Sequence, residues 1–220
     1  MRLMDHEVLT FCADDAHGAP IMMKADELGI EPTAFIDEIN KNHQESLAKF
    51  GIEYTNYYST HSKENEALVS EIYLDAKSSG YIYKKEIEQC FDEEKQMFLA
   101  DRYVVGECPK CSAKNQYGDG CEECGATYSA TELINPKSSL SGTTPITKIS
   151  EHIFFDLEKA KDDLVNFLDN SSIQKPILGK LSEWLDGDLK SWDISRDAPY
   201  FGFQIPDETK KYFYVWVDAP

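Results

Sequence analysis

Four cysteines in two closely spaced pairs constrain this chain more than any other feature. Cys108 and Cys111 bracket two residues, and Cys121 and Cys124 do the same after a polar loop at 112–120. A C-x-x-C turn directs two sulfur atoms toward one point, and two facing turns supply the tetrahedral set of thiolates that Zn²⁺ accepts. Four protein ligands leave the metal no open position for a substrate. The spacing therefore predicts one structural zinc ion that holds a small subdomain together and performs no chemistry.

Other interpretations of the cysteines remain. Two disulfides would need an oxidising compartment, but the stretch at 1–13 lacks the layout of a signal peptide. A redox C-x-x-C usually stands alone beside a βαβ pattern. Cys12 lies in an apolar run, where we expect a buried, small hydrophobic residue.

The charge balance limits the partners. Forty acidic and 22 basic side chains give a net charge of −18, which argues against a broad grip on DNA or another phosphate backbone. No apolar run reaches the length of about 18 residues that a membrane-spanning helix needs. Hydrophobic residues make up 41% of the chain, enough for a core. We expect a cytoplasmic protein with no membrane and no DNA partner.

The hydrophobic pattern predicts alternating strands and helices. Strands are expected at 8–13, 52–59 and 211–217, and helices at 21–28, 32–50, 63–79, 156–168 and 175–185. Strand and helix in alternation predict an α/β fold with a parallel sheet. Between 81 and 155 the apolar runs are short and interrupted by charge. That stretch predicts a small β-rich insert, which needs a metal because its core is small.

Several stretches carry a family resemblance by their order and spacing. They are Phe11–Gly18, Ser59–Ser62, the two cysteine pairs with Gly118, Cys124–Tyr128, Ser150–Phe155, Trp192–Gly202 and Tyr212–Pro220. Together they resemble the methionyl-tRNA synthetases, a family of class I aminoacyl-tRNA synthetases, over essentially the whole chain. The resemblance implies a Rossmann-like class I synthetase core interrupted by a β-rich zinc-knuckle insert. It implies core at 1–78, a connective insert at 79–190 with knuckles at about 106–126, and a return to the core at 191–220.

The resemblance also implies an activity. The family consists of ATP-dependent ligases that join methionine to ATP as methionyl-adenylate and then charge tRNA(Met). Methionine, ATP and tRNA(Met) are therefore the expected substrates. The family's two ATP signatures, His-x-Gly-His and Lys-Met-Ser-Lys-Ser, do not occur in the 220 residues. We interpret the chain as an internal part of such a ligase that is inactive by itself.

The resemblance assigns roles to five residues. Asp15 is expected to receive the α-ammonium of methionine, because a carboxylate in a partly dry pocket pairs well with a cation. Trp216 is expected to form an aromatic wall beside Ala219 and Pro220, which suits a polarisable thioether. Arg196 is expected to act in the activation step, where a guanidinium stabilises developing phosphate charge.

Each assignment has a structural alternative. Asp15 could cap the following helix, Trp216 could belong to the core of an apolar strand, and Arg196 could pair with a neighbouring aspartate. His17 suits a nucleotide-side or a structural role equally, while His61 and His152 give no signal of their own. For the whole chain the alternatives are a stand-alone zinc-stapled binding module without catalysis and a truncated, non-functional product.

Overall fold

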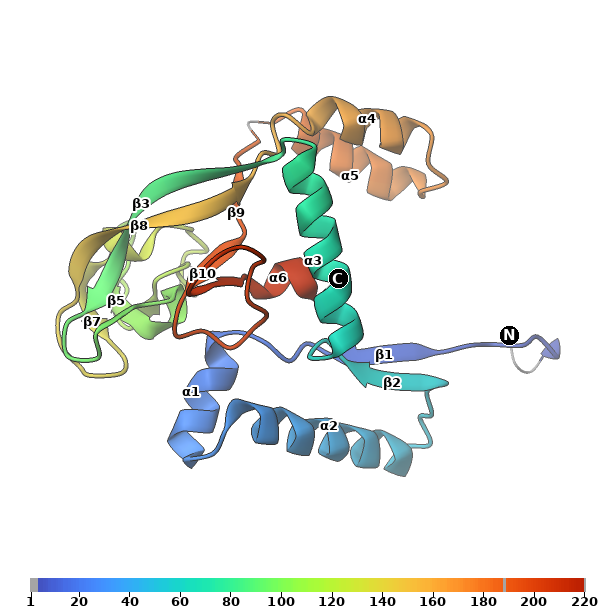
Figure 1. Ribbon diagram of the computed structural model, residues 1–220, viewed down its shortest axis with the longest axis horizontal. Helices are drawn as coiled ribbons and strands as arrows, with labels where there is room; N and C mark the ends of the chain where they lie inside the picture. The colour runs from blue at the N-terminus through green and yellow to red at the C-terminus, as the bar shows by residue number, and fades with distance from the viewer. Residues whose placement is uncertain (1–3, 188, 220) are drawn as a thin grey trace.

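The computed structural model describes residues 4–187 and 189–219, which form a mixed α/β protein (Figure 1). The helices are α1 (Ala19–Leu28), α2 (Pro32–Lys49), α3 (Lys63–Ser78), α4 (Lys161–Asp169), α5 (Lys175–Leu185) and α6 (Val215–Asp218), with 3₁₀ turns η2 (Asp101–Tyr103) and η3 (Ala130–Glu132). The strands are β1 (Phe11–Asp14), β2 (Asn56–Ser59), β3 (Ile82–Asp92), β4 (Met97–Phe98), β5 (Val104–Glu107), β6 (Gln116–Tyr117), β7 (Ile134–Ser138), β8 (Ile146–Phe155), β9 (Trp192–Asp193), β10 (Ser195–Asp197) and β11 (Lys211–Phe213). Among the described residues, no helix combines the length and the apolar character that crossing a membrane requires.

The first three helices begin and end close to their predicted positions because local signals set them. Gly29 ends α1 in the left-handed conformation, with φ of 66°, which glycine adopts without a steric penalty. Ser62 begins α3, and its Oγ accepts a hydrogen bond from the backbone N–H of Asn65 at 3.2 Å. Helix α4 begins at Lys161, later than predicted, because Asp156 binds the Lys159 N–H at 3.1 Å and forms a turn first.

The expected parallel pairing is present at the N-terminal end of the protein. Strands β1 and β2 pair in parallel, with Phe11 opposite Asn56 and Asp14 opposite Ser59. Helices α1 and α2 connect the two strands, and α2 runs alongside them in Figure 1. This arrangement places the loops that follow β1 and β2 at the same edge, because both strands end there.

A long antiparallel ribbon carries the middle of the chain. Strands β3 and β8 pair from Ile82 opposite Phe155 to Phe91 opposite Ile146, in a four-stranded sheet of order β4-β3-β8-β9. The ribbon runs from the helical hairpin α4–α5 to the β-rich lobe that contains β5 and β7 (Figure 1). The sequence predicted only short strands at 81–83 and 153–155. It missed their length because several charged side chains along the ribbon face solvent and interrupt the apolar pattern.

Two buried clusters hold these parts together. One joins β3 to the lobe and comprises Ala19, Cys90, Met97, Leu99, Tyr103, Val104, Ala130 and Leu133. The other packs α3 and β8 against the C-terminal segment and comprises Val69, Tyr73, Ile153, Ile194, Phe203, Ile205 and Phe213. The second cluster spans residues far apart in the sequence, so it fixes the C-terminal segment against the rest of the protein.

The prediction of a single strand at 211–217 is wrong. Strand β11 ends at Phe213, and the chain then turns into the one-turn helix α6. The turn occurs because the Tyr214 N–H bonds to the carbonyl of Ile194 at 2.9 Å, and the Val217 N–H returns to the Tyr214 carbonyl at 2.8 Å. Trp216 therefore projects from a helix rather than from a sheet.

Replacement of Phe213 by alanine tests the importance of the second cluster. Phe213 is fully buried, so Phe213→Ala should lower the free energy of unfolding by about 3–5 kcal/mol through lost burial and an unfilled cavity. Phe50→Ala is the matched control, because Phe50 is 82% exposed and its loss should change that energy by less than about 0.5 kcal/mol. Urea unfolding measures both. Equal losses in the two variants would contradict this account of the core.

Candidate functional site

The four cysteine sulfurs of the two pairs converge on one point. Cys108 Sγ lies 3.8 Å from Cys124 Sγ, Cys111 Sγ lies 3.6 Å from Cys121 Sγ, and all four lie within 4.8 Å of one another. Four thiolates at about 2.3 Å from a central zinc ion would be about 3.8 Å apart. The four cysteines are free, and the structure shows no disulfide among them. The donor set and spacing fit a tetrahedral metal ion.

The two turns that carry these cysteines have similar backbones. The Ser112 N–H bonds to the Cys108 carbonyl at 2.9 Å, and the Gly125 N–H bonds to the Cys121 carbonyl at 2.9 Å. Ser112 and Gly125 both have positive φ, 62° and 70° respectively. For Gly125, which follows the second cysteine pair, a tight turn with positive φ suits glycine. Each turn also directs a backbone N–H at its first sulfur, from Lys110 at 3.3 Å and from Cys124 at 3.4 Å.

The backbone donors of the first turn favour the thiolate form of Cys108. Burial alone would raise the pKa of the Cys108 thiol, but hydrogen bonds from the N–H groups of Cys111 and Lys110 lower it to about 7. A thiol that ionises near neutral pH is a ready metal ligand.

Cys12, which lies outside the cluster, is partly exposed, so its predicted burial is wrong.

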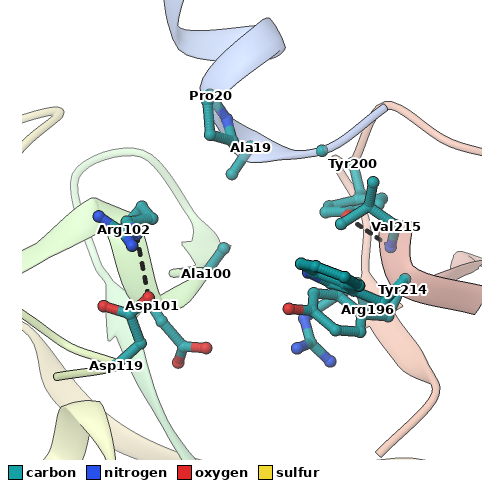
Figure 2. Close-up of a pocket in the computed structure, with 12 residues that line it drawn as sticks. Ala19, Pro20, Ala100, Asp101, Arg102, Asp119, Arg196, Tyr200, Tyr214 and Val215 are labelled. Atoms are coloured by element: carbon teal, nitrogen blue, oxygen red, sulfur yellow. Dashed lines mark hydrogen bonds and ion pairs between the residues drawn. The ribbon is translucent and has the colours of Figure 1, made fainter. Parts of the chain in front are cut away.

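A cavity of about 200 Å³ lies beside this lobe (Figure 2). It is lined by Gly18, Ala19 and Pro20 at the start of α1, by Ala100, Asp101, Arg102 and Asp119 from the lobe, and by Arg196, Tyr200, Tyr214, Val215 and Trp216 from the C-terminal segment. Figure 2 shows Asp101, Arg102 and Asp119 on one side and Arg196 with Tyr214 on the other. The fold thus brings Arg196 and Trp216 to one cavity.

Gly118 connects the cysteine turns to the cavity wall. Its N–H bonds to the Asp101 carbonyl at 3.1 Å. A Cβ at this position would lie 2.6 Å from the Ala130 Cβ and 2.7 Å from the Asp101 carbonyl oxygen, so only glycine fits without displacing them. Asp119 follows directly and pairs with Arg102 at 3.0 Å. The loop between the two cysteine pairs therefore determines where these acidic and basic groups lie.

Arg196 is held at the cavity from several directions. Its Nη1 donates to the carbonyl of Ser195 at 2.7 Å and lies 3.6 Å from Asp193 Oδ2. The guanidinium carbon lies 4.0 Å from the centre of the Tyr214 ring, a cation–π contact. Desolvation raises the pKa of Asp101 across the cavity and the Arg196 charge partly opposes that shift, although Asp101 itself is exposed to solvent. Only 16% of the Arg196 side chain is exposed, so a solvated surface ion pair does not describe it.

Asp15 lies outside the lining of this cavity and is itself exposed, at the start of the largely buried loop after β1. It does not cap α1, whose N-cap is Gly18 without a side-chain hydrogen bond. Partial desolvation, and then the nearby charge of Asp218, raise the pKa of Asp15. Its neighbour Asp14 has a structural role, because it accepts hydrogen bonds from Tyr57 and from other side chains.

A contact between two histidines and an aspartate links the loop of Asp15 to the helix of Trp216. His17 Nδ1 bonds to Asp218 Oδ2, and His17 Nε2 lies 2.8 Å from His61 Nδ1. His17 and Asp218 are both buried. Asp15 and Trp216 are thus on segments that touch, rather than on opposite sides of the protein.

Trp216 and its neighbours differ from the expectation of a buried strand. The Trp216 side chain is 64% exposed at the edge of the cavity, so the core alternative is wrong. Ala219 is half-buried, and its N–H bonds to the Val215 carbonyl at 3.1 Å, which ends α6. Pro220 lies outside the described residues.

Sequence reasoning missed a second group of buried polar residues around His152. His152 is fully buried, and its ring nitrogens contact Asp193 and Asp197. Burial alone would lower the pKa of His152, but hydrogen bonds to these two carboxylates raise it. A histidine directly before the apolar run Ile153–Phe155 was the available signal, and its partners are more than 40 positions away.

Comparison with known proteins identifies the family. The family model described as tRNA synthetases class I (M) matches residues 1–220.

The chain belongs to this family.

Solved structures of class I methionyl-tRNA synthetase share the fold of this synthetase chain. The Mycobacterium tuberculosis enzyme in complex with methionyl-adenylate aligns with a TM-score of 0.66 and 17% identity, over 99% of this chain and 38% of that chain. A second structure of the M. tuberculosis enzyme, bound by methionyl-adenylate, also gives 0.66 and 17%, over 99% of this chain and 39% of that one. The chain therefore spans less than two fifths of the length of these enzymes.

Loss of one sulfur tests the metal site. Cys121→Ser should abolish the binding of one zinc ion per chain and increase amide hydrogen exchange at 98–135, while α1 and α2 remain protected, because the metal holds only the lobe. Metal analysis and hydrogen exchange measure the two effects. Cys12→Ser, which alters a cysteine outside the cluster, should retain the metal. A reduced, freshly purified wild-type sample without zinc would disprove the site.

Proposed function

We propose that this chain carries the methionine-recognising part of a methionine–tRNA ligase, which activates methionine with ATP and charges tRNA(Met). The main support is the meeting of Arg196 and Trp216 at one cavity, in a chain that belongs to the class I synthetase family. Two similar folds were solved with methionyl-adenylate. In this proposal residues 1–78 and 191–220 belong to the catalytic core, and 79–190 form the connective insert.

Asp15 is the proposed receptor for the α-ammonium group. Desolvation, and then the nearby carboxylate of Asp218, raise the pKa of Asp15, so a bound cation would relieve repulsion between two negative charges. Its exposure on a loop leaves it accessible to a ligand. Binding of an ammonium group would stabilise ionised Asp15 and lower its pKa, so affinity should fall as the pH drops through the raised pKa of the free protein.

Trp216 is the proposed wall for the methionine side chain, together with Ala219 and Pro220. Its exposed indole lies at the cavity edge, where an apolar ligand would cover it. Sulfur is polarisable and gains from contact with an aromatic ring. Coverage of this indole would also remove apolar surface from water.

Arg196 is the proposed partner of the phosphate group during activation. It is stacked on Tyr214 and largely buried at the cavity, so its charge is fixed in place and weakly screened. A preorganised guanidinium stabilises charge that develops in the transition state without further rearrangement. Zn²⁺ at the four cysteines would have a structural role, ATP would be a substrate, and the cytoplasm, which keeps thiols reduced, would be the compartment.

A ligand-binding measurement tests whether Trp216 forms an aromatic wall for the methionine side chain. Trp216→Ala should weaken binding of a non-hydrolysable sulfamoyl analogue of methionyl-adenylate to the purified chain roughly tenfold, because the thioether loses its aromatic contact. Trp184→Ala is the control, since Trp184 lies on α5 and is similarly exposed, at 54%. Calorimetry measures both affinities. Unchanged binding in the Trp216 variant would remove this residue from the site.

The isolated chain should not form adenylate. Both ATP signatures are missing from its sequence, so methionine-dependent exchange between ATP and pyrophosphate should stay at background. A clear exchange signal from the 220-residue chain would contradict this expectation. If the chain also failed to bind the analogue, the alternative of a zinc-stapled binding module would replace the proposal.

A further inference from the structure

The side chain of His152 is a fully buried basic group on β8. Its Nδ1 lies 2.7 Å from Asp193 Oδ2, and its Nε2 lies 2.9 Å from Asp197 Oδ2. A carboxylate can only accept, so both ring nitrogens donate and the imidazole carries a positive charge. His152 thus connects β8 to β9 and to β10.

The charges around His152 balance. Lys211 Nζ on β11 lies 2.7 Å from Asp197 Oδ1 and 3.0 Å from Ser150 Oγ. Ser150 Oγ in turn donates to Asp197 Oδ2 at 2.8 Å. Two cations, His152 and Lys211, therefore face two anions, Asp193 and Asp197, in a largely buried network in which only His152 is fully buried. Hydrogen bonds raise the pKa of His152, and contacts with His152, Lys211 and Ser150 lower that of Asp197 despite burial.

Arg196 stands between these two aspartates in the sequence and touches the network. The Asp193 oxygen that binds His152 is the same Oδ2 that lies 3.6 Å from Arg196 Nη1. The other Asp193 oxygen accepts from the Ser195 N–H at 3.1 Å. With both aspartates already paired, the Arg196 charge is left for the cavity, where it faces Asp101 and the Arg102–Asp119 pair.

We propose that His152 is a positioning residue for Arg196: by holding Asp193 and Asp197 in place, it orients the guanidinium toward an anionic ligand in the cavity. Without His152, Asp193 Oδ2 would lose its imidazole partner and form a tight ion pair with Arg196, while Oδ1 stays bonded to Ser195. That pair would draw the guanidinium away from the ligand and reduce its effective charge. The inference rests on the proposed function, because only that function places a phosphate beside Arg196.

The first test needs no ligand. In nuclear magnetic resonance spectra of the full chain, the His152 ring nitrogens should keep the signature of an imidazolium above pH 6.5, the ordinary value for histidine. His152→Gln should shift the Arg196 Nε–H resonance. His43→Gln should not, although it also removes a histidine paired with an aspartate, because His43 contacts Asp14 and its side chain is 53% exposed. A neutral His152 at pH 6.5, or an unmoved Arg196 signal, would overturn the inference.

The second test measures binding of the sulfamoyl analogue. His152→Gln should weaken binding of the analogue roughly tenfold to a hundredfold, as expected when a binding group is displaced. Methionine alone lacks a phosphate-like group, so its binding to this variant should equal its binding to the wild type. In an Arg196→Gln background the His152 change should have no further effect, whereas a general structural role would give additive losses. Additive losses would disprove positioning.

A second variant distinguishes the loss of positioning from misfolding of the His152→Gln chain. Asp193→Asn keeps the shape of the side chain and removes the charge through which His152 acts. It should leave analogue binding near the wild-type value, and in this background His152→Gln should have little further effect, because no carboxylate remains at position 193 to pair with Arg196. Wild-type chain that shows the imidazolium but binds no analogue would disprove the proposed function, and with it the role of His152 toward a phosphate. Analogue binding that is unchanged by His152→Gln, or that His152→Gln weakens equally in the Asp193→Asn background, would disprove the inference alone.

Discussion

The loop between the two cysteine pairs is the constraint on which the cavity depends. Its ends are held by four sulfurs within 4.8 Å of one another, and its middle is pressed against Asp101 at Gly118. One wall of the cavity therefore takes its position from the lobe. Because the lobe has a small core, a metal that holds its sulfurs would stabilise the cavity as well. A metal site with no open coordination position would in this way determine the geometry of the neighbouring cavity.

The opposite wall depends on buried charge. His152, Asp193, Asp197 and Lys211 form a network whose charges balance. Removal of one member would leave an uncompensated charge in the interior, which costs more than the intact network contributes. The network joins the β3–β8 ribbon to the strands that carry Arg196, whereas the apolar cluster around Phe213 joins the same ribbon to α3. Burial of apolar side chains, which is non-directional, sets the position of the C-terminal segment. The directional hydrogen bonds of the charged network set the orientation of its side chains.

Sequence patterns succeeded where the determining signals are local. Proline at helix starts and glycine at helix ends gave the bounds of the first helices, and the cysteine spacing predicted their convergence. Sequence patterns failed where contacts between distant residues determine how long a strand is or where it ends. The β3–β8 ribbon is longer than its apolar runs because backbone pairing over Ile82–Phe91 does not require apolar side chains on an exposed face. The run at 211–217 divides after Phe213 because Tyr214 bonds to Ile194, a residue that no local window includes.

The sequence by itself determined the α/β class with a parallel pairing of strands, the cysteine cluster and the family. These follow from periodicity, from turn residues and from motif order, all of which lie along the chain. Only the tertiary structure decided that Arg196 and Trp216 share a cavity, that Trp216 is exposed on a helix, and that His152 carries a buried charge beside Arg196. The physical reason is that burial and hydrogen bonding depend on partners far away in the sequence, and their positions exist only once the chain has folded.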